Sequence, residues 1–165
     1  MKKIIFLTIS VVIGILVYNQ NEEIIIPDDS IRVRIIANSN NIEDLYEKKK
    51  LKEEIKNELY DLVMNADNSS EASSSIQDNM DKINKLISSK TKDYSINYGM
   101  NYFPKKAYKG VVYKEGNYNS LVITLGKGLG ENWWCVLYPP LCMMEDNQST
   151  SDVEYRLFVK DVLNN

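Results

Sequence analysis

The sequence contains no histidine and only two cysteines among its 165 residues. Without histidine, the chain cannot assemble a Ser-His-Asp or Cys-His catalytic group, a His-ligated zinc site or a histidine-based pH sensor. Two cysteines alone cannot supply the four ligands of a zinc site. The chemistries that remain are those of carboxylates and thiols, and no arrangement of residues predicts catalytic, cofactor-binding or metal-binding positions.

A basic surface is also missing. The chain carries 20 Lys and Arg against 23 Asp and Glu, and its densest basic stretch, residues 48–52, is flanked by glutamates. This pattern predicts a solvated helix face and no nucleic-acid partner. With 44% apolar and 26% charged residues, the composition is that of a globular protein, and the length is that of one domain.

The one long apolar run lies at the amino terminus, where Met1, Lys2 and Lys3 precede residues 4–18. A basic lead, an apolar run and a polar stretch form the pattern of an export signal. As a helix, this run spans about 22 Å, less than the roughly 30 Å hydrocarbon core of a membrane. The length favours a signal peptide, but no small-x-small cleavage motif follows, so a membrane anchor through residues 4–18 is an open alternative.

The chain therefore divides into three parts. We expect residues 1–23 to be a signal peptide or amino-terminal anchor and residues 24–30 to be a linker. Residues 31–165 are expected to form a single domain outside the cytoplasm, in contact with the membrane only through the amino-terminal segment.

The first half of this domain reads as a strand followed by helices. Residues 31–35 alternate apolar and polar side chains, which predicts a strand with one buried face. Asn41 is placed to cap a helix over residues 42–65. A second amphipathic helix carries Ile76, Met80, Ile83 and Ile87 on one stripe. Together the two helices predict a hairpin against one face of a sheet.

The second half is rich in predicted strands. They cover residues 94–103, 111–113 and 121–125, and the last is a continuous apolar run typical of a central strand. A turn is expected at residues 115–117, and residues 153–159 fit either a strand or a helix. The whole pattern predicts an α+β fold with a mostly antiparallel sheet and the two-helix hairpin packed on one side.

Glycines recur at Gly126, Gly128 and Gly130. Their G-x-G-x-G spacing matches neither the dinucleotide-binding motif nor the phosphate-loop motif. We interpret them as a strand-to-loop turn that lets the backbone pass close beneath the tryptophans that follow.

The segment after the glycines combines tryptophans, prolines and both cysteines. In an extended chain, Trp133 and Trp134 point to opposite faces, so one can be buried and the other presented to a partner, although both could fill the core. Cys135 and Cys142 enclose a Pro-Pro turn, which in an exported protein predicts a structural disulfide, with free thiols as the alternative.

Arg32 and Arg34 lie on the same face of the first predicted strand. Two adjacent cations repel each other unless an anion meets them. We expect either salt bridges to helix carboxylates such as Glu54 or Glu58, or an anionic partner surface.

Two segments resemble a known family. Residues 31–39, IRVRIIANS, are similar to the IRLRILANS segment of the stage II sporulation protein R family. Residues 121–142, LVITLGKGLGENWWCVLYPPLC, resemble its signature VITLGxGxGxNWWCVLFPPLC. The second match is long and rich in rare residue types. The chain departs from the family pattern at Asn40, where aspartate is frequent, and at Tyr138, where phenylalanine stands.

The resemblance implies a developmental signal and not an enzyme, with no cofactor. Family members are made in the forespore and secreted into the space between forespore and mother cell. There they activate a membrane-embedded aspartic protease that cleaves the sigma-E precursor. We expect Trp133→Ala or Trp134→Ala to abolish this processing. The candidate partner-binding residues are Arg32, Arg34, Asn38, Ser39, Asn132, Trp133, Trp134, Tyr138, Pro139 and Pro140.

Two other classes of function stay open at this point. One is a secreted cell-wall hydrolase that uses carboxylates such as Glu131, with the glycines and aromatics lining a sugar groove. The other is an anchored structural protein of the cell envelope.

Overall fold

The computed structural model describes residues 8–12, 24–142 and 151–164, of which 8–12 are helical. The elements in chain order are β1 (Ile24–Ile25), β2 (Ile31–Ile36), α2 (Ile42–Val63), α3 (Ser69–Asp78), α4 (Met80–Ser88), β3 (Tyr94–Phe103), β4 (Lys106–Tyr108), β5 (Val111–Tyr113), β6 (Gly116–Leu125), β7 (Asn132–Tyr138) and α6 (Asp152–Asn164). Most of the expected signal or anchor segment lies outside the described residues. Within the described part, no helix has the length and hydrophobicity needed to span a membrane.

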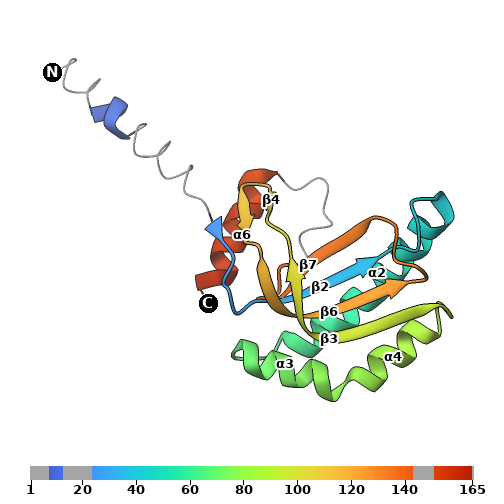
Figure 1. Ribbon diagram of the computed structural model, residues 1–165. Coiled ribbons are helices and arrows are strands. Elements are labelled where there is room, and N and C mark those ends of the chain that lie inside the picture. The colour runs from blue at the N-terminus through green and yellow to red at the C-terminus, as the bar shows by residue number, and fades with distance from the viewer. Residues whose placement is uncertain (1–7, 13–23, 143–150, 165) are drawn as a thin grey trace.

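A four-stranded sheet in the order β3-β6-β2-β7 forms the centre of the protein (Figure 1). Strand β6 pairs antiparallel with β3 and parallel with β2, and β7 pairs antiparallel with β2. The predicted α+β class is confirmed, and the sheet is mixed because its two central strands run parallel. Strand β6 begins at Gly116, where the sequence suggested a turn, because β3 is long enough to pair with it as far as Phe103.

Helices α2, α3 and α4 cover one face of this sheet, which we call the helix face (Figure 1). The pleat directs alternate residues of each strand to that face. In β2 these are Ile31, Val33 and Ile35, each at most 1% exposed. The helices contribute Leu51, Ile55, Leu59, Val63, Ala72, Ile76, Ile83 and Ile87 to the same core. Because each buried aliphatic side chain contributes roughly 1.5–3 kcal/mol, this layer holds the helices on the sheet.

The predicted hairpin is a three-helix layer, because its second helix is divided at Asn79. Asn79 leaves helical geometry at φ −104° and ψ 12°, and its Nδ2 donates to the Ser75 carbonyl at 2.8 Å. An asparagine side chain that bonds to nearby backbone competes with the helix. The cap predicted for α2 is confirmed, since the Asn41 side chain accepts the Asp44 N–H at 2.8 Å.

A second sheet, in the order β1-β5-β4, packs with α6 around the end of β7. Strand β1 runs parallel to β5, and β4 runs antiparallel to it. Residues 24–30, which we expected to be a linker, therefore include a strand, and Ile24 and Ile26 are buried. Residues 152–164 are helical, with Tyr155 and Val159 buried four residues apart on one side of α6, as an amphipathic helix requires.

Candidate functional site

The two segments that carry the family resemblance meet at one end of the four-stranded sheet. The turn after β2, residues 38–41, packs against the loop between β6 and β7, residues 126–131, and we call this contact the loop interlock. Asn38 Oδ1 accepts the backbone N–H of Lys127 at 2.9 Å, and Asn40 Oδ1 accepts a second N–H from the end of the loop at 2.7 Å. Side-chain oxygens of the first segment thus fix the backbone of the second.

Gly126 and Gly130 make this approach possible, and they lie against the turn after β2, whereas Gly128 packs against Thr124 at the end of β6. A Cβ on Gly126 would stand 2.3 Å from Asn38 Oδ1, and a Cβ on Gly130 would stand 2.2 Å from the backbone oxygen of Ser39. The strand-to-loop turn is confirmed. The expectation that the glycines pass beneath the tryptophans is wrong, because the loop folds back over the end of β2.

Asn38 and Ser39 use their polar groups inside the fold. Asn38 Nδ2 and Ser39 Oγ both donate to Asp44 Oδ2, at 2.9 Å and 2.6 Å. These contacts tie the interlock to the first turn of α2. Partner binding by these two residues stays a prediction, and their observed contacts are structural.

The face of the sheet opposite the helices, which we call the distal face, carries Arg32. Its guanidinium centre lies 3.3 Å from the Tyr118 ring centroid, and Nη1 donates to the Lys114 carbonyl at 3.2 Å. The residue is only 3% exposed, so burial lowers the pKa of this arginine, against the opposing influence of Tyr118. A ring face and a carbonyl therefore stabilise this buried cation, with a smaller contribution from the Asp28 carboxylate.

Arg34 and Trp134 stand beside each other on the same distal face. The Arg34 guanidinium lies 4.4 Å from the Trp134 ring centroid, and its Nε donates to Asn132 Oδ1 at 2.9 Å. The Lys106 ammonium, from β4, lies 4.9 Å from the same ring, and Phe103 packs edge-on against it at 5.1 Å. Two cations thus lie over the half-buried ring of Trp134.

The expected salt bridges from Arg32 and Arg34 to helix carboxylates are wrong. The helices lie on the other face of the sheet, where Glu54 pairs with Lys90 at 2.6 Å and Glu58 pairs with Lys82. Since strand residues two apart share a face, the two arginines point together, but away from the helices.

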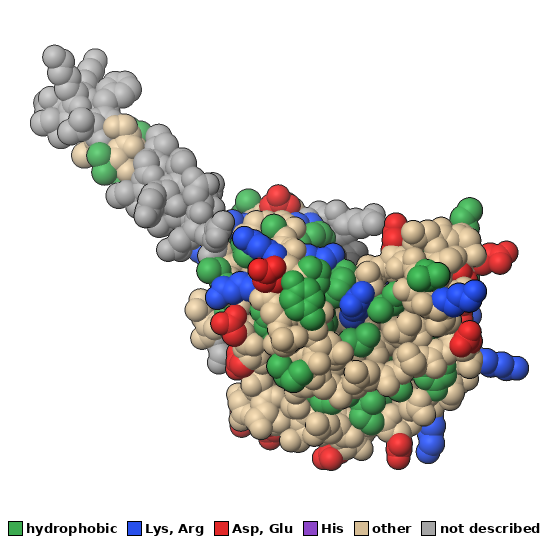
Figure 2. All heavy atoms as spheres, in the orientation of Figure 1, with side chains coloured by type: hydrophobic (Ala, Val, Ile, Leu, Met, Phe, Trp, Pro, Cys, Tyr) green, Lys and Arg blue, Asp and Glu red, His purple; other side chains and the backbone are tan. Residues whose placement is uncertain are grey.

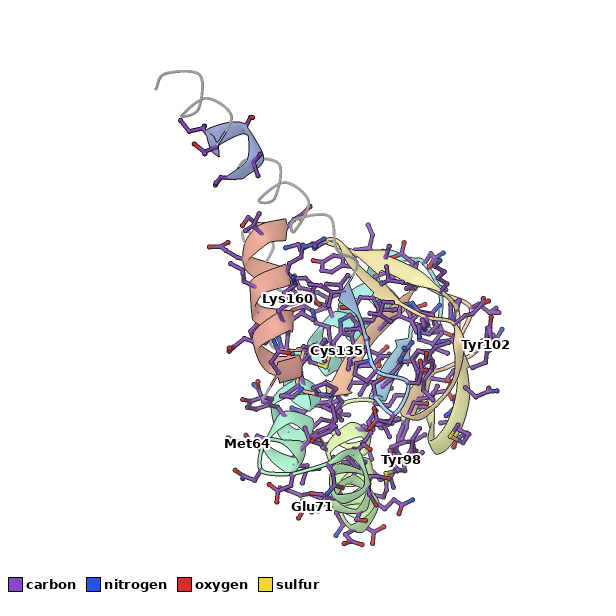
Figure 3. The ribbon with its side chains drawn as sticks, turned by 90° about the vertical axis from the view of Figure 1, so that its left-hand side faces the viewer. Met64, Glu71, Tyr98, Tyr102, Cys135 and Lys160 are labelled. Atoms are coloured by element: carbon purple, nitrogen blue, oxygen red, sulfur yellow. A yellow bond between two sulfur atoms is a disulfide. The ribbon has the colours of Figure 1, made fainter. Side chains whose placement is uncertain are left out.

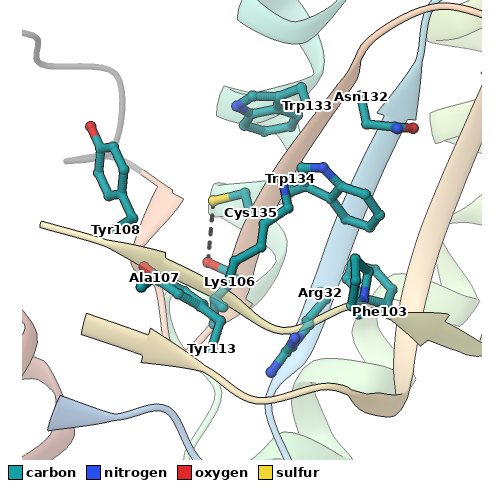
Figure 4. Close-up of a pocket in the computed structure, with 12 residues that line it drawn as sticks. Arg32, Phe103, Lys106, Ala107, Tyr108, Tyr113, Asn132, Trp133, Trp134 and Cys135 are labelled. Atoms are coloured by element: carbon teal, nitrogen blue, oxygen red, sulfur yellow. Dashed lines mark hydrogen bonds between the residues drawn. The ribbon is translucent and has the colours of Figure 1, made fainter. Parts of the chain in front are cut away.

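A pocket of about 440 Å³ lies between this distal face and β4 (Figure 4). Among the described residues, its lining contains two cations, Arg32 and Lys106, and no Asp or Glu. Acidic and basic side chains are interspersed on the face of the molecule seen in Figure 2. Because the pocket is lined by two cations while the surface as a whole carries both signs of charge, the pocket is a local site that favours anions. Its lining residues are Arg32, Phe103, Pro104, Lys106, Ala107, Tyr108, Tyr113, Asn132, Trp133, Trp134, Cys135 and Val136.

The two tryptophans project from opposite sides of β7, as predicted (Figure 4). Trp133 packs against the core of the helix face, with the Lys52 ammonium 5.7 Å from its ring centroid. Both rings are half-buried. The structure therefore matches neither one buried and one exposed tryptophan nor two tryptophans that fill the core. Both residues line the pocket, but Trp134 lies beside Arg34 and Lys106 on the distal face, whereas the Trp133 ring packs against the helix layer.

The remaining candidates lie at the far end of β7. The Tyr138 hydroxyl donates to the Ala66 carbonyl after α2 at 3.4 Å, and burial raises the pKa of this tyrosine. Pro139 follows through a cis peptide bond, and Pro140 continues the turn. The ten candidate residues are therefore distributed over three places, and only Arg32, Arg34, Asn132 and Trp134 meet at the pocket side of the sheet.

Cys135 and Cys142 form the disulfide that closes this turn, with Cα atoms 5.5 Å apart (Figure 3). Both are buried, at 4% and 2% exposure, in the core of the helix face. The Leu141 N–H also donates to the Val136 carbonyl at 3.2 Å across the turn. The disulfide therefore fixes the end of β7 against the core.

Replacing both cysteines with alanine is expected to lower the free energy of unfolding by about 2–4 kcal/mol, because the short loop is no longer constrained in the unfolded chain. Urea unfolding of both proteins measures the difference. A reducing agent should destabilise the parent protein and leave the double variant unchanged. Equal midpoints for oxidised and reduced parent protein would contradict the prediction.

Three residues of the site were not predicted from the sequence: Phe103, Lys106 and Tyr118. Each comes from a different strand, and their rings and ammonium group converge on Arg32 and Trp134 only through the fold. The alternation around residue 103 could have placed Phe103 and the arginines on one face, but no local pattern shows that β4 folds over them. Among the described residues, no group of three or more acidic, Cys or His side chains could hold a metal ion.

Comparison with known proteins gives a consistent result. The sequence model of a family described as stage II sporulation protein R matches residues 27–148. A stage II sporulation protein R from Bacillus subtilis (strain 168) is 35% identical over 134 residues, which cover 77% of this chain and 59% of that relative. The match thus spans less than two thirds of the relative's length. Its name describes a sporulation protein and no enzymatic activity. No solved structure matches the chain.

Proposed function

This chain belongs to the stage II sporulation protein R family, and we propose that it is an exported signalling protein of endospore formation. In this proposal, the forespore secretes the protein into the space between forespore and mother cell. It there activates a membrane-embedded aspartic protease, which cleaves the sigma-E precursor. The amino-terminal segment directs export and is then either removed or kept as an anchor.

The observation that supports a contact role is the surface around Trp134. A half-buried tryptophan beside a pocket, held by Arg34 and Lys106, has the character of an interaction hot spot. The loop interlock and the disulfide fix both ends of β7, so this surface is preorganised. A rigid contact surface loses little conformational entropy when a partner binds.

No observation favours the cell-wall hydrolase. Glu131 is absent from the lining of the pocket, and no other carboxylate of residues 24–142 and 151–164 contributes to it. Glycoside hydrolysis generally needs two carboxylates that face each other across the substrate.

The proposal is tested by producing the chain together with the protease and the sigma-E precursor in a bacterium that does not sporulate. Shortening of the precursor on a gel is expected only when all three proteins are present. A version without residues 1–23, retained in the host cytoplasm, should leave the precursor intact. Shortening that occurs without this chain, or none despite its export, would overturn the proposal.

A further inference from the structure

In the part of the chain that the structure describes, no strand pairs with the outer edge of β7. Strand β7 is the terminal strand of the four-stranded sheet and pairs with β2. In an antiparallel pair, alternate residues turn both backbone groups toward the neighbouring strand, and the others turn both away. The Glu131 carbonyl accepts from Ala37, at the end of β2, whereas the Val136 carbonyl accepts from Leu141, outside the sheet. From Glu131 to Val136, odd-numbered residues therefore face β2 and even-numbered residues face outward, whereas a bulge shifts the pairing before Tyr138.

Asn132 and Trp134 accordingly direct their backbone N–H and C=O groups away from the sheet. Among the described residues, these outward groups form no hydrogen bond, whereas the outward carbonyl of Val136 is occupied by Leu141 at 3.2 Å. The free stretch thus begins at Asn132 and is closed at its other end by the disulfide turn. Unpaired groups in such a row form a template for an added strand.

The pocket follows this edge. Five consecutive residues of β7, from Asn132 to Val136, line it, although their side chains alternate between the two faces of the sheet. Trp133 projects to the side opposite Trp134 (Figure 4). We conclude that the pocket meets β7 along its backbone, which leaves space beside the unpaired groups.

The positive charge beside Trp134 indicates which side chain an added strand would carry at this position. Directly opposed residues of neighbouring strands share a face, so a residue added opposite Trp134 would place its side chain on the distal face. There it would meet the Lys106 ammonium and the Arg34 guanidinium. Among the described residues, neither cation forms an ion pair with a carboxylate, and no acidic residue lines the pocket. A carboxylate is the side chain that complements this position.

We propose that β7 takes up an extended acidic segment of its protein partner as a fifth strand of the sheet, with a carboxylate over Trp134 between Arg34 and Lys106. The proposal rests on the signalling function proposed above and adds the mode of contact. The free stretch from Asn132 to Trp134 spans about 7 Å at roughly 3.4 Å per residue, so the added strand is short.

A proline scan of the edge tests strand addition in the three-protein processing assay. Asn132→Pro removes an outward N–H that β2 does not use, and proline is tolerated at such edge positions. Asn132→Ala is the matched control, because both variants lose the side-chain contact with Arg34. Processing of the sigma-E precursor is expected to be at least tenfold lower with Asn132→Pro than with Asn132→Ala. Equal processing by the two variants would overturn the added strand.

Charge reversal tests the acidic side chain. Lys106→Glu is expected to lower processing at least tenfold, whereas Lys92→Glu, the same charge change at an exposed residue that does not line the pocket, should leave it unchanged. Equal processing by these two variants would overturn the acidic contact. Loss with Lys106→Glu but none with Asn132→Pro would mean docking through side chains alone and would likewise reject strand addition.

Amide hydrogen exchange of the unmodified chain keeps the test independent of how the variants fold. When the detergent-solubilised protease is added, exchange of the Trp134 N–H is expected to slow at least tenfold, and that of the Cys135 N–H, which faces β2, should change little. Unaltered exchange at Trp134 while the parent chain still triggers processing would reject this inference and leave the signalling function standing. Absence of processing by the parent chain would reject the signalling function itself.

Discussion

Gly130→Ala is expected to lower the free energy of unfolding by about 3 kcal/mol, toward the upper end of the usual range for overpacking. The added Cβ would stand 2.2 Å from the Ser39 carbonyl oxygen, 2.6 Å from the Ser39 carbonyl carbon and 2.8 Å from the Ala37 Cβ. Two of these atoms are backbone, so no side-chain rotation relieves the contact.

The backbone cannot separate without further loss. The Gly130 N–H donates to the Ala37 carbonyl at 2.9 Å, and the Leu129 N–H donates to the Asn38 carbonyl at 3.0 Å. Moving the loop away from the turn after β2 would break these bonds and the interlock with them. Urea unfolding with the disulfide intact measures the effect. Leu129→Ala, in the same loop but 74% exposed, should change stability by less than about 0.5 kcal/mol.

If Gly130→Ala also changed the free energy of unfolding by less than about 0.5 kcal/mol, the result would contradict the structure of the interlock. Because the total stability of a domain is only about 5–15 kcal/mol, the expected loss is a large fraction of it. The variant should therefore also accumulate at a lower level in cells.

Trp134→Ala is expected to reduce processing of the sigma-E precursor at least tenfold per folded molecule, whereas Trp133→Ala should reduce it only as far as it reduces the amount of folded protein. The reason is the opposite placement of the two rings. Trp134 borders the pocket between Arg34 and Lys106, while Trp133 packs against the helix-face core near Lys52. From the sequence, we expected either Trp133→Ala or Trp134→Ala to abolish processing. The structure restricts the direct effect to Trp134.

Both tryptophans are half-buried, so each alanine variant should also lose stability, by about 1–3 kcal/mol, somewhat less than for a fully buried ring. The comparison must therefore be made per folded molecule, with the folded amount measured by circular dichroism of the purified variant. Normal signalling by Trp134→Ala would remove this surface from the contact. An equal loss per folded molecule in both variants would mean that the two faces contribute alike.

The local features of the fold were predictable from the sequence because short-range patterns determine them. The alternation in residues 31–35 identified β2 and the shared face of Arg32 and Arg34. The apolar stripe and the Asn41 cap identified α2. The division at Asn79 was missed because the stripe from Ile76 to Ile87 continues through it, and periodicity alone does not detect one asparagine that bonds to its own backbone.

The site was less accessible, because its parts meet over long distances along the chain. The alternation shows that the two arginines point together, but not that Tyr118 and Trp134 receive them. Strand β4 has three exposed residues and no apolar alternation, so nothing in its sequence marks a strand or places Lys106 over Trp134. The glycines signal a close approach, yet their neighbours in the turn after β2 emerge only from the fold.

The parallel pairing of β2 with β6 has a consequence for the order in which the chain folds. Residues 31–36 reach their central neighbour only when residues 116–125 are available, so the helices between them have no complete sheet to pack on until then. Loop-closure entropy must be overcome before such distant contacts stabilise anything. A chain that emerges amino terminus first, from a ribosome or a translocation channel, therefore stays open until its last central strand is out.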